Sequence, residues 1–232
     1  IVYPAYTKLG EKVVEETRQI SVVEGSEVTL TFMLNKAVAT ARLQAKDGSE
    51  LELTGDPNRV GVYGVSLTAT KSHRYELHLA DSEGLKNKMP PRFTIDVHKN
   101  LPPELKPTFP NRDITASAIE EVTLEAEVSD DYGLEAYGLS YTMVGASSQD
   151  VTLGEAVEAG GTLSMQYLLA LENLEAGPNQ LVTYHFGADD VGPDGKVRRS
   201  YSDMYFAEVR PFDEIFRESQ SSQSQQQQQQ EN

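Results

Sequence analysis

The sequence contains no cysteine and no tryptophan among its 232 residues. The lack of cysteine excludes disulfide bonds, thiol chemistry and cysteine-ligated zinc or iron–sulfur sites. It does not identify the compartment, because extracytoplasmic domains also exist without disulfides. The lack of tryptophan removes the Cys–Trp–Cys signature of antibody domains and leaves no obvious aromatic platform for a carbohydrate.

Long apolar runs are also missing. The longest segments without a charged residue, 136–149 and 159–171, are shorter than the ~18 apolar residues that a membrane-spanning helix requires. We therefore expect that this chain does not itself span a membrane. It also lacks an initiator methionine and a signal segment, so we expect it to be a piece of a longer protein.

Positive charge is scarce in the second half of the chain. Residues 1–100 hold 13 Lys and Arg against 13 Asp and Glu, whereas residues 101–232 hold 7 against 23, and the net charge is −16. An acidic field of this kind repels anionic lipid and nucleic acid, which is bound through clustered Lys and Arg. The sequence therefore predicts no nucleic-acid partner and favours a protein partner with a basic surface.

The sequence does contain apolar residues that alternate with polar ones at period two, which predicts strands with one buried face. No segment has a convincing helical period, and Asp47-Gly48 is a hairpin turn signal that suits a type I′ turn. This pattern is typical of small antiparallel β-sandwiches. The alternating segments are 28–34, 41–45, 51–53, 63–69, 75–79 and 93–97 in the first half, and 122–128, 137–143, 182–188 and 205–209 in the second.

The two halves repeat one design. Glu27-Val-Thr-Leu30 recurs as Glu121-Val-Thr-Leu124, and the segment 75–81 is echoed by 184–189. The second copy is about 15 residues longer between these landmarks, and we assign the extra residues to Gly145–Gly161. Between the copies, residues 100–110 contain four prolines, which predicts an extended linker rather than an interior strand.

The predicted fold is therefore all-β, with two tandem Ig-like antiparallel β-sandwich domains and a polar, Gln-rich C-terminal tail. The first domain covers residues 1–100 and the second, acidic domain covers residues 101–212. Residues 213–232 form the tail, which we interpret either as disordered or as the start of a helix.

Two aromatic segments have alternative interpretations. Residues 3–7 and 202–212 can serve as docking strands for a partner. Alternatively, the first packs across its own domain and the second is a last core strand that stops at Pro211. Alternating aromatic residues usually lie inside a sandwich, which favours the second interpretation.

Five aspartates follow two of the predicted strands and are candidate calcium ligands, because grouped carboxylates supply the hard oxygen atoms that Ca²⁺ takes. Their spacing does not match an EF-hand loop, and Asp residues are also good turn formers. The four histidines have no zinc-ligand spacing and are expected to be solvated or singly hydrogen-bonded. The five calcium candidates are Asp130, Asp131, Asp189, Asp190 and Asp194.

No catalytic constellation stands out. The nucleophile elbow, the phosphate-binding loop and the dinucleotide fingerprint are all absent from the sequence, and no pair of carboxylates is singled out for glycoside hydrolysis. We therefore expect a protein that is not an enzyme and that needs no cofactor, calcium being the one candidate.

The chain resembles a family of bacterial membrane proteins of unknown function, whose extracytoplasmic part holds tandem Ig-like β-sandwich domains followed by a Gln-rich region. The resemblance rests on loose motifs in a shared order. It implies a position on the periplasmic side of the bacterial inner membrane, with transmembrane helices upstream of residue 1, and it implies no catalytic residue. The motifs are Tyr3-Pro-Ala-Tyr-Thr7, Glu24-Gly-Ser-Glu-Val28, Asp130-Asp-Tyr-Gly-Leu134, Val209-Arg-Pro-Phe212 and the glutamines from Gln220 onward.

The expected role is a non-enzymatic spacer or protein–protein interaction module in the cell envelope. The alternative is a calcium-dependent adhesion or carbohydrate-binding module, which metal-dependent melting or glycan binding would distinguish.

Overall fold

The structure is a computed structural model that describes residues 1–211. The predictions for the Gln-rich tail fall outside the described residues. The described chain divides into two compact units, which are described separately. Unit 1 consists of residues 1–100 with 193–196, and unit 2 consists of residues 101–192 with 197–211.

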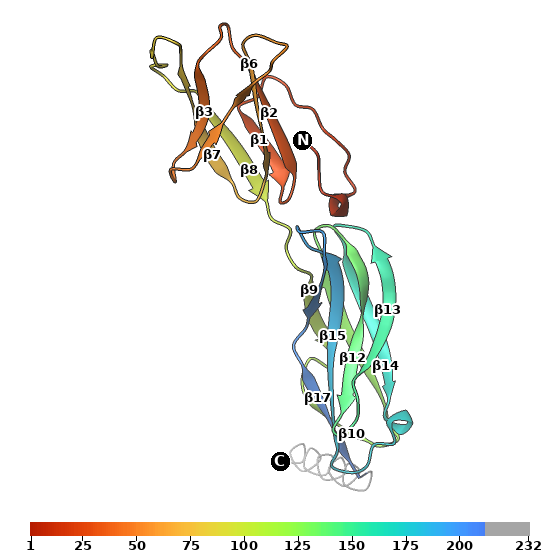
Figure 1. The fold of residues 1–232 in the computed structure, drawn as a ribbon. Coiled ribbons are helices and arrows are strands. Elements are labelled where there is room, and N and C mark those ends of the chain that lie inside the picture. The colour runs from red at the N-terminus through yellow and green to blue at the C-terminus, as the bar shows by residue number, and fades with distance from the viewer. Residues whose placement is uncertain (212–232) are drawn as a thin grey trace, which may run out of the picture. The chain divides into compact units, whose positions relative to one another are not determined.

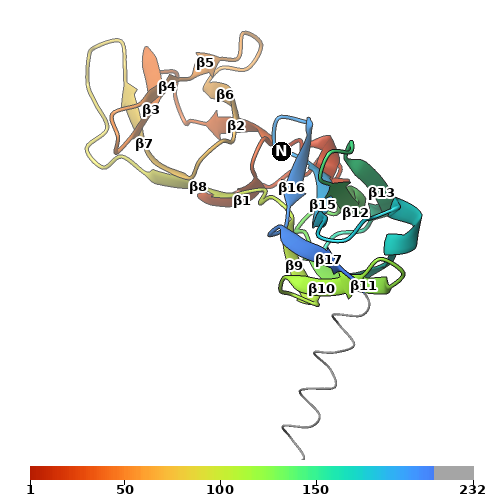
Figure 2. The ribbon, with the colours of Figure 1, turned by 90° about the horizontal axis from the view of Figure 1, so that it is seen from below.

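Unit 1 is a sandwich of two sheets (Figures 1 and 2). One sheet has the strand order β1-β8-β7-β3-β4 and the other the order β2-β6-β5. The strand β1 pairs with β8 in parallel, whereas the other pairs are antiparallel. The elements are η1 (Ala5–Thr7), β1 (Gln19–Val23), β2 (Glu27–Met33), β3 (Thr40–Ala45), β4 (Glu50–Glu52), β5 (Thr54–Gly55), β6 (Val62–Thr68), β7 (His73–Ala80) and β8 (Arg92–His98).

Unit 2 repeats the strand order of the larger sheet, whereas the third strand of its smaller sheet, β9, pairs with β11 rather than with β14. The order β10-β17-β15-β12-β13 forms one sheet, in which β16 also pairs with β15, and β14-β11-β9 forms the other. The parallel pair is here β10 with β17. The elements are β9 (Glu104–Phe109), β10 (Ile114–Ser117), β11 (Glu121–Ser129), β12 (Leu134–Met143), β13 (Gln149–Val157), β14 (Thr162–Ala170), η2 (Leu171–Leu174), β15 (Leu181–Val191), β16 (Val197–Tyr201) and β17 (Tyr205–Arg210).

Each unit has its own apolar core, which the alternating residues supply because every second side chain of a strand points between the sheets. In unit 1 the core includes Leu43, Leu77 and Ile95, and in unit 2 it includes Leu124 and Phe186. Two stacked antiparallel sheets with this strand order constitute an Ig-like sandwich. The predicted fold class, all-β with tandem Ig-like sandwiches, is confirmed.

The sequence repeat corresponds to equivalent strands. The two Glu-Val-Thr-Leu segments begin β2 and β11, and Tyr75 and Tyr184 lie buried in β7 and β15. The packing interpretation of the aromatic segments is also confirmed. Tyr6 of η1 is buried and donates a hydrogen bond to the Glu24 carbonyl, and β17 is a core strand in which Val209 is fully buried.

Three local predictions were wrong. The Pro-rich segment is a strand from Glu104 onward: β9 is an edge strand, a position where proline is tolerated because half of the backbone groups need no partner. The extra residues of the second copy are not confined to 145–161. The connection from β14 to β15 in unit 2 spans 171–180, whereas the equivalent connection in unit 1, from β6 to β7, spans only 69–72.

The hairpin at Asp47 is real, but its turn is not of type I′. Only Gly48 has a positive φ, of 86°, and the Ser49 amide and hydroxyl both donate to the Asp47 carboxylate. A type I′ turn needs positive φ at both central residues. The connection is instead a three-residue loop closed between Ala45 and Ser49.

Candidate binding groove on the outer face of unit 2

Asp130, directly after β11, acts as a turn former. The Asp130 Oδ2 atom accepts the backbone N–H groups of Tyr132 at 2.8 Å and Gly133 at 2.7 Å. Gly133 has φ 99°, and a Cβ atom there would lie 2.4 Å from the Val157 carbonyl oxygen. The Asp130-Asp-Tyr-Gly motif is therefore a tight turn that only glycine can close.

Asp130 also has a buried side. Its Oδ1 atom is buried and has no hydrogen-bond partner among residues 1–211. Burial raises the pKa of Asp130, the two backbone hydrogen bonds oppose this, and the charges of Asp131 and Asp190 add to the rise.

The cation beside these carboxylates is a guanidinium group. Asp190, on β15, is almost fully buried and faces Arg198 on β16. The Arg198 Nε atom donates to Asp190 Oδ1 at 2.8 Å, and its Nη2 atom donates to Oδ2 at 2.7 Å. The hydrogen bonding that Arg198 donates to Asp190 is the main cause that raises the pKa of Arg198.

The same network holds the first residue of unit 2. The Leu101 amide donates to Asp131 Oδ2 at 3.2 Å, and the Leu101 carbonyl accepts from Arg198 Nη2. Asp131 and the Asp190–Arg198 pair therefore fix the backbone on both sides of Leu101.

The other two candidates lie apart from this network. Asp189 forms an ion pair with Arg199 at 3.4 Å. Asp194 accepts the Lys196 amide at 3.1 Å and belongs to the segment assigned to unit 1. Among residues 1–211, no group of three or more His, Asp or Glu side chains is arranged to hold a metal ion. Calcium binding by the five aspartates stays a prediction.

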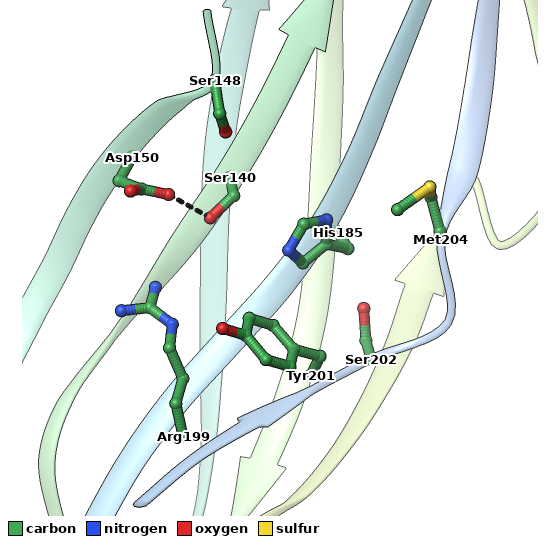
Figure 3. A pocket seen from close by; sticks show the side chains of 8 residues that line it. All are labelled: Ser140, Ser148, Asp150, His185, Arg199, Tyr201, Ser202 and Met204. Carbon is green, nitrogen blue, oxygen red and sulfur yellow. Dashed lines mark hydrogen bonds between the residues drawn. The ribbon is translucent and has the colours of Figure 1, made fainter.

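A groove of about 590 Å³ lies on the outer face of the larger sheet of unit 2 (Figure 3). Its residues come from β12, β13, β15 and β16 and from the segments next to them. They are Ser140, Ser148, Asp150, His185, Arg199, Tyr201, Ser202 and Met204.

Strand register explains how this groove is built. Ser140 on β12 lies directly opposite Asp150 on β13 and opposite His185 on β15. One step along the sheet, Gly138 lies opposite Gly187. The missing side chain of Gly187 leaves a hollow on the outer face, whereas a Cβ atom on Gly138 would lie 2.1 Å from the Val151 carbonyl oxygen, so the backbone of β13 covers that position.

The hollow is occupied by the side chain of Arg199. A Cβ atom on Gly187 would lie 3.0 Å from Arg199 Nε, so the guanidinium group rests directly on that backbone. Arg199 also lies 5.8 Å from the centre of the Tyr201 ring, a cation–π distance. Tyr201 in turn contacts His185 edge to face at 5.2 Å.

Ser140 and His185 do not form a catalytic pair. Ser140 is buried, and its hydroxyl donates to Asp150 Oδ1 (Figure 3). A serine nucleophile instead needs its hydroxyl bonded to the imidazole that accepts the proton. Burial and then the Arg199 charge lower the pKa of His185, while the Asp150 charge acts in the opposite direction. The arrangement suits binding through hydrogen bonds and aromatic contact.

This groove was not predicted from the sequence. His185 was expected to be solvated or singly hydrogen-bonded, and Ser140, Asp150, Arg199 and Tyr201 were not among the candidate site residues. The available signal was a glycine inside each of two predicted strands, since glycine in a strand interior marks close approach to the backbone.

No family model and no curated protein matches the chain. Among solved structures, fibronectin(III)-like modules of CbhA from Clostridium thermocellum align at 15% identity over 85% of this chain and 92% of that one, with a TM-score of 0.30. The major pilin subunit BcpA of Bacillus cereus aligns at 13% identity over 79% and 70%, with a TM-score of 0.35. An ICAM-5 D1–D4 ectodomain fragment aligns at 14% identity over 84% and 50%, with a TM-score of 0.33.

Proposed function

We propose that the chain is a non-enzymatic protein-binding module whose contact site is the groove of unit 2. The observation that carries this proposal is the contact set of Arg199, Tyr201 and His185 on an open sheet face. Tyrosine and arginine are the side chains that most often dominate protein interfaces. Tyr201 is 60% exposed and available to a partner.

The partner is expected to present a basic surface. Residues 101–232 contain 7 Lys and Arg against 23 Asp and Glu. A field of this sign accelerates association with a positively charged protein and loses its effect as salt rises. Association is therefore expected to slow strongly between 50 and 500 mM salt, with a smaller change in dissociation.

The proposed setting is the periplasmic side of the bacterial inner membrane, with the chain forming part of a membrane-anchored protein. The sequence resemblance supports this setting. Within the described residues, no helix is long and apolar enough to cross a membrane.

The test is site-specific photo-crosslinking in cells that make the full protein. A photoreactive residue at Tyr201 is expected to give one discrete protein adduct. The matched control is Leu168, which is 49% exposed on β14 in the other sheet of unit 2, and it should not give that adduct. Equal labelling from both positions, or from neither, would contradict the assignment of the groove.

A groove-filling variant separates binding from folding. Gly187→His places a large side chain where Arg199 now lies, and the guanidinium group can move because it is the far end of a flexible chain. We expect the Tyr201 adduct to disappear while the melting temperature of unit 2 changes by only a few degrees. An unchanged adduct would show that the partner binds elsewhere.

A further inference from the structure

Three loops at one end of unit 1 expose large aliphatic side chains, which we call the apolar tips. Met33 at the end of β2 is 84% exposed, and Val60 before β6 is 89% exposed. Between β7 and β8, Leu85 is 66% and Met89 88% exposed. These loops lie at the end of unit 1 opposite to Asn100 (Figure 1). Several large apolar side chains exposed to solvent at one end of a domain indicate an interaction surface.

The loops are joined to one another. The Leu34 amide donates to the Gly61 carbonyl at 2.8 Å, which ties the β2–β3 loop to the loop before β6. Lys36 Nζ lies 2.9 Å from Asp81 Oδ2, which ties it to the β7–β8 loop. The apolar tips are therefore presented together by one hydrogen-bonded end of the sandwich.

Cationic side chains lie beside the apolar tips. Lys86 and Lys88 lie between Leu85 and Met89 and are exposed to solvent, in a loop that also exposes Glu83. Arg59 precedes Val60 and forms an ion pair with Asp56 at 2.7 Å. No aromatic residue accompanies the apolar tips in these loops. Short aliphatic side chains with flanking lysines match the interface of a bilayer, where methylene groups enter the acyl region and ammonium groups bind headgroup phosphates.

The acidic half of the chain begins at Leu101, after unit 1. Asn100 lies beyond the seven residues of β8, roughly 25 Å from the loops at about 3.3 Å per residue. The Debye length is about 8 Å at physiological salt. Unit 1 itself is electrically balanced, with 13 cations and 13 anions in residues 1–100.

We propose that the apolar tips and Lys86 and Lys88 dock peripherally on a bilayer with anionic phosphate headgroups. This contact goes beyond protein binding by the unit 2 groove and does not depend on it. It would orient unit 1 with its loop end against a membrane surface.

The test is co-sedimentation of the full chain with large unilamellar vesicles at 0.15 M NaCl. Vesicles of 30% phosphatidylglycerol in phosphatidylethanolamine are compared with pure phosphatidylcholine vesicles. We expect at least tenfold tighter binding to the anionic vesicles. The variant Leu85→Ser/Met89→Ser and the variant Lys86→Ser/Lys88→Ser should each weaken that binding at least tenfold, because one removes the insertion and the other the headgroup contact.

The matched control is Ile119→Ser, which changes a residue of unit 2 that is 68% exposed, close to the 66% of Leu85. It should bind like the unchanged chain. All of these positions are exposed, and unchanged melting will show that the variants fold. Absence of binding to anionic vesicles, or full binding by the Leu85→Ser/Met89→Ser variant, would overturn the proposal and leave the apolar tips to a protein surface.

Discussion

Removal of Arg198 tests how the buried carboxylate of unit 2 is stabilised. The Asp190 side chain is 2% exposed, whereas the side chain of Arg198 is 30% exposed. Arg198→Ala leaves the carboxylate buried without its three hydrogen bonds to the guanidinium group. A buried ion that loses its partner costs about 3–5 kcal/mol, and we expect a loss of that size in the unfolding free energy of unit 2.

The converse substitution is expected to cost less. Asp190→Ala leaves a guanidinium group that is already partly in water and can turn outward, so the expected loss is about 1–3 kcal/mol. The two variants remove the same ion pair. The difference between their two losses of unfolding free energy therefore measures the cost of burying an unpaired carboxylate rather than the strength of the ion pair.

Urea unfolding followed by circular dichroism and tyrosine fluorescence measures both losses. With a slope of ~1.5 kcal/mol per molar urea, Arg198→Ala should lower the midpoint of unit 2 by ~2–3 M. The transition of unit 1 is the internal control and should not move, since the pair lies within unit 2.

Equal losses of unfolding free energy for the two variants, or no loss for Arg198→Ala, would refute this account.

Three further outcomes are expected. Gly133→Ala should destabilise unit 2 by about 1–3 kcal/mol in urea unfolding, because φ is 99° and the new Cβ would meet a carbonyl oxygen. A loss below 0.5 kcal/mol, on the order of a neutral surface change, would contradict this. The melting midpoint in excess calcium should equal the midpoint in a chelator, because Arg198 already supplies the positive charge beside Asp190. A rise of several degrees in calcium would show that the five aspartates are ligands. Burial raises the pKa of Tyr184 to about 12, so its stabilising contribution is complete below pH 10 and is lost as the pH rises toward 12. Absorbance titration should find one tyrosine that ionises only as the protein unfolds, and complete ionisation near pH 10 in the folded state would contradict the burial.

Strands with one buried face could be predicted from the sequence because their side chains alternate. The segment 122–128 is an example, in which Val122, Leu124, Ala126 and Val128 are all buried in β11. The strand β13 could not be found in this way. It is an edge strand in which Val151, Leu153 and Val157 share one half-buried face, but Glu155 interrupts their alternation.

Two features were readable from the sequence but were missed. Leu163, Met165, Tyr167 and Leu169 alternate through β14, within a segment that we noted only for its lack of charge. Asp190 continues the series of inward-facing residues of β15. This position puts its carboxyl group in the core, where a buried charge needs a cationic partner. That the partner is Arg198 depends on the register of β15 with β16, which the sequence does not contain.

The outer faces of the two units differ at one equivalent position. With Tyr75 equivalent to Tyr184, Gly187 corresponds to His78. In unit 1, His78 lies opposite Arg42, whereas in unit 2 Gly187 lies opposite Gly138. The missing side chain of Gly187 lets the Arg199 guanidinium group lie on the sheet, while the backbone of β13 covers Gly138. The fold supplies an equivalent outer face in both units, and the residues that lie on that face determine the shape of its surface.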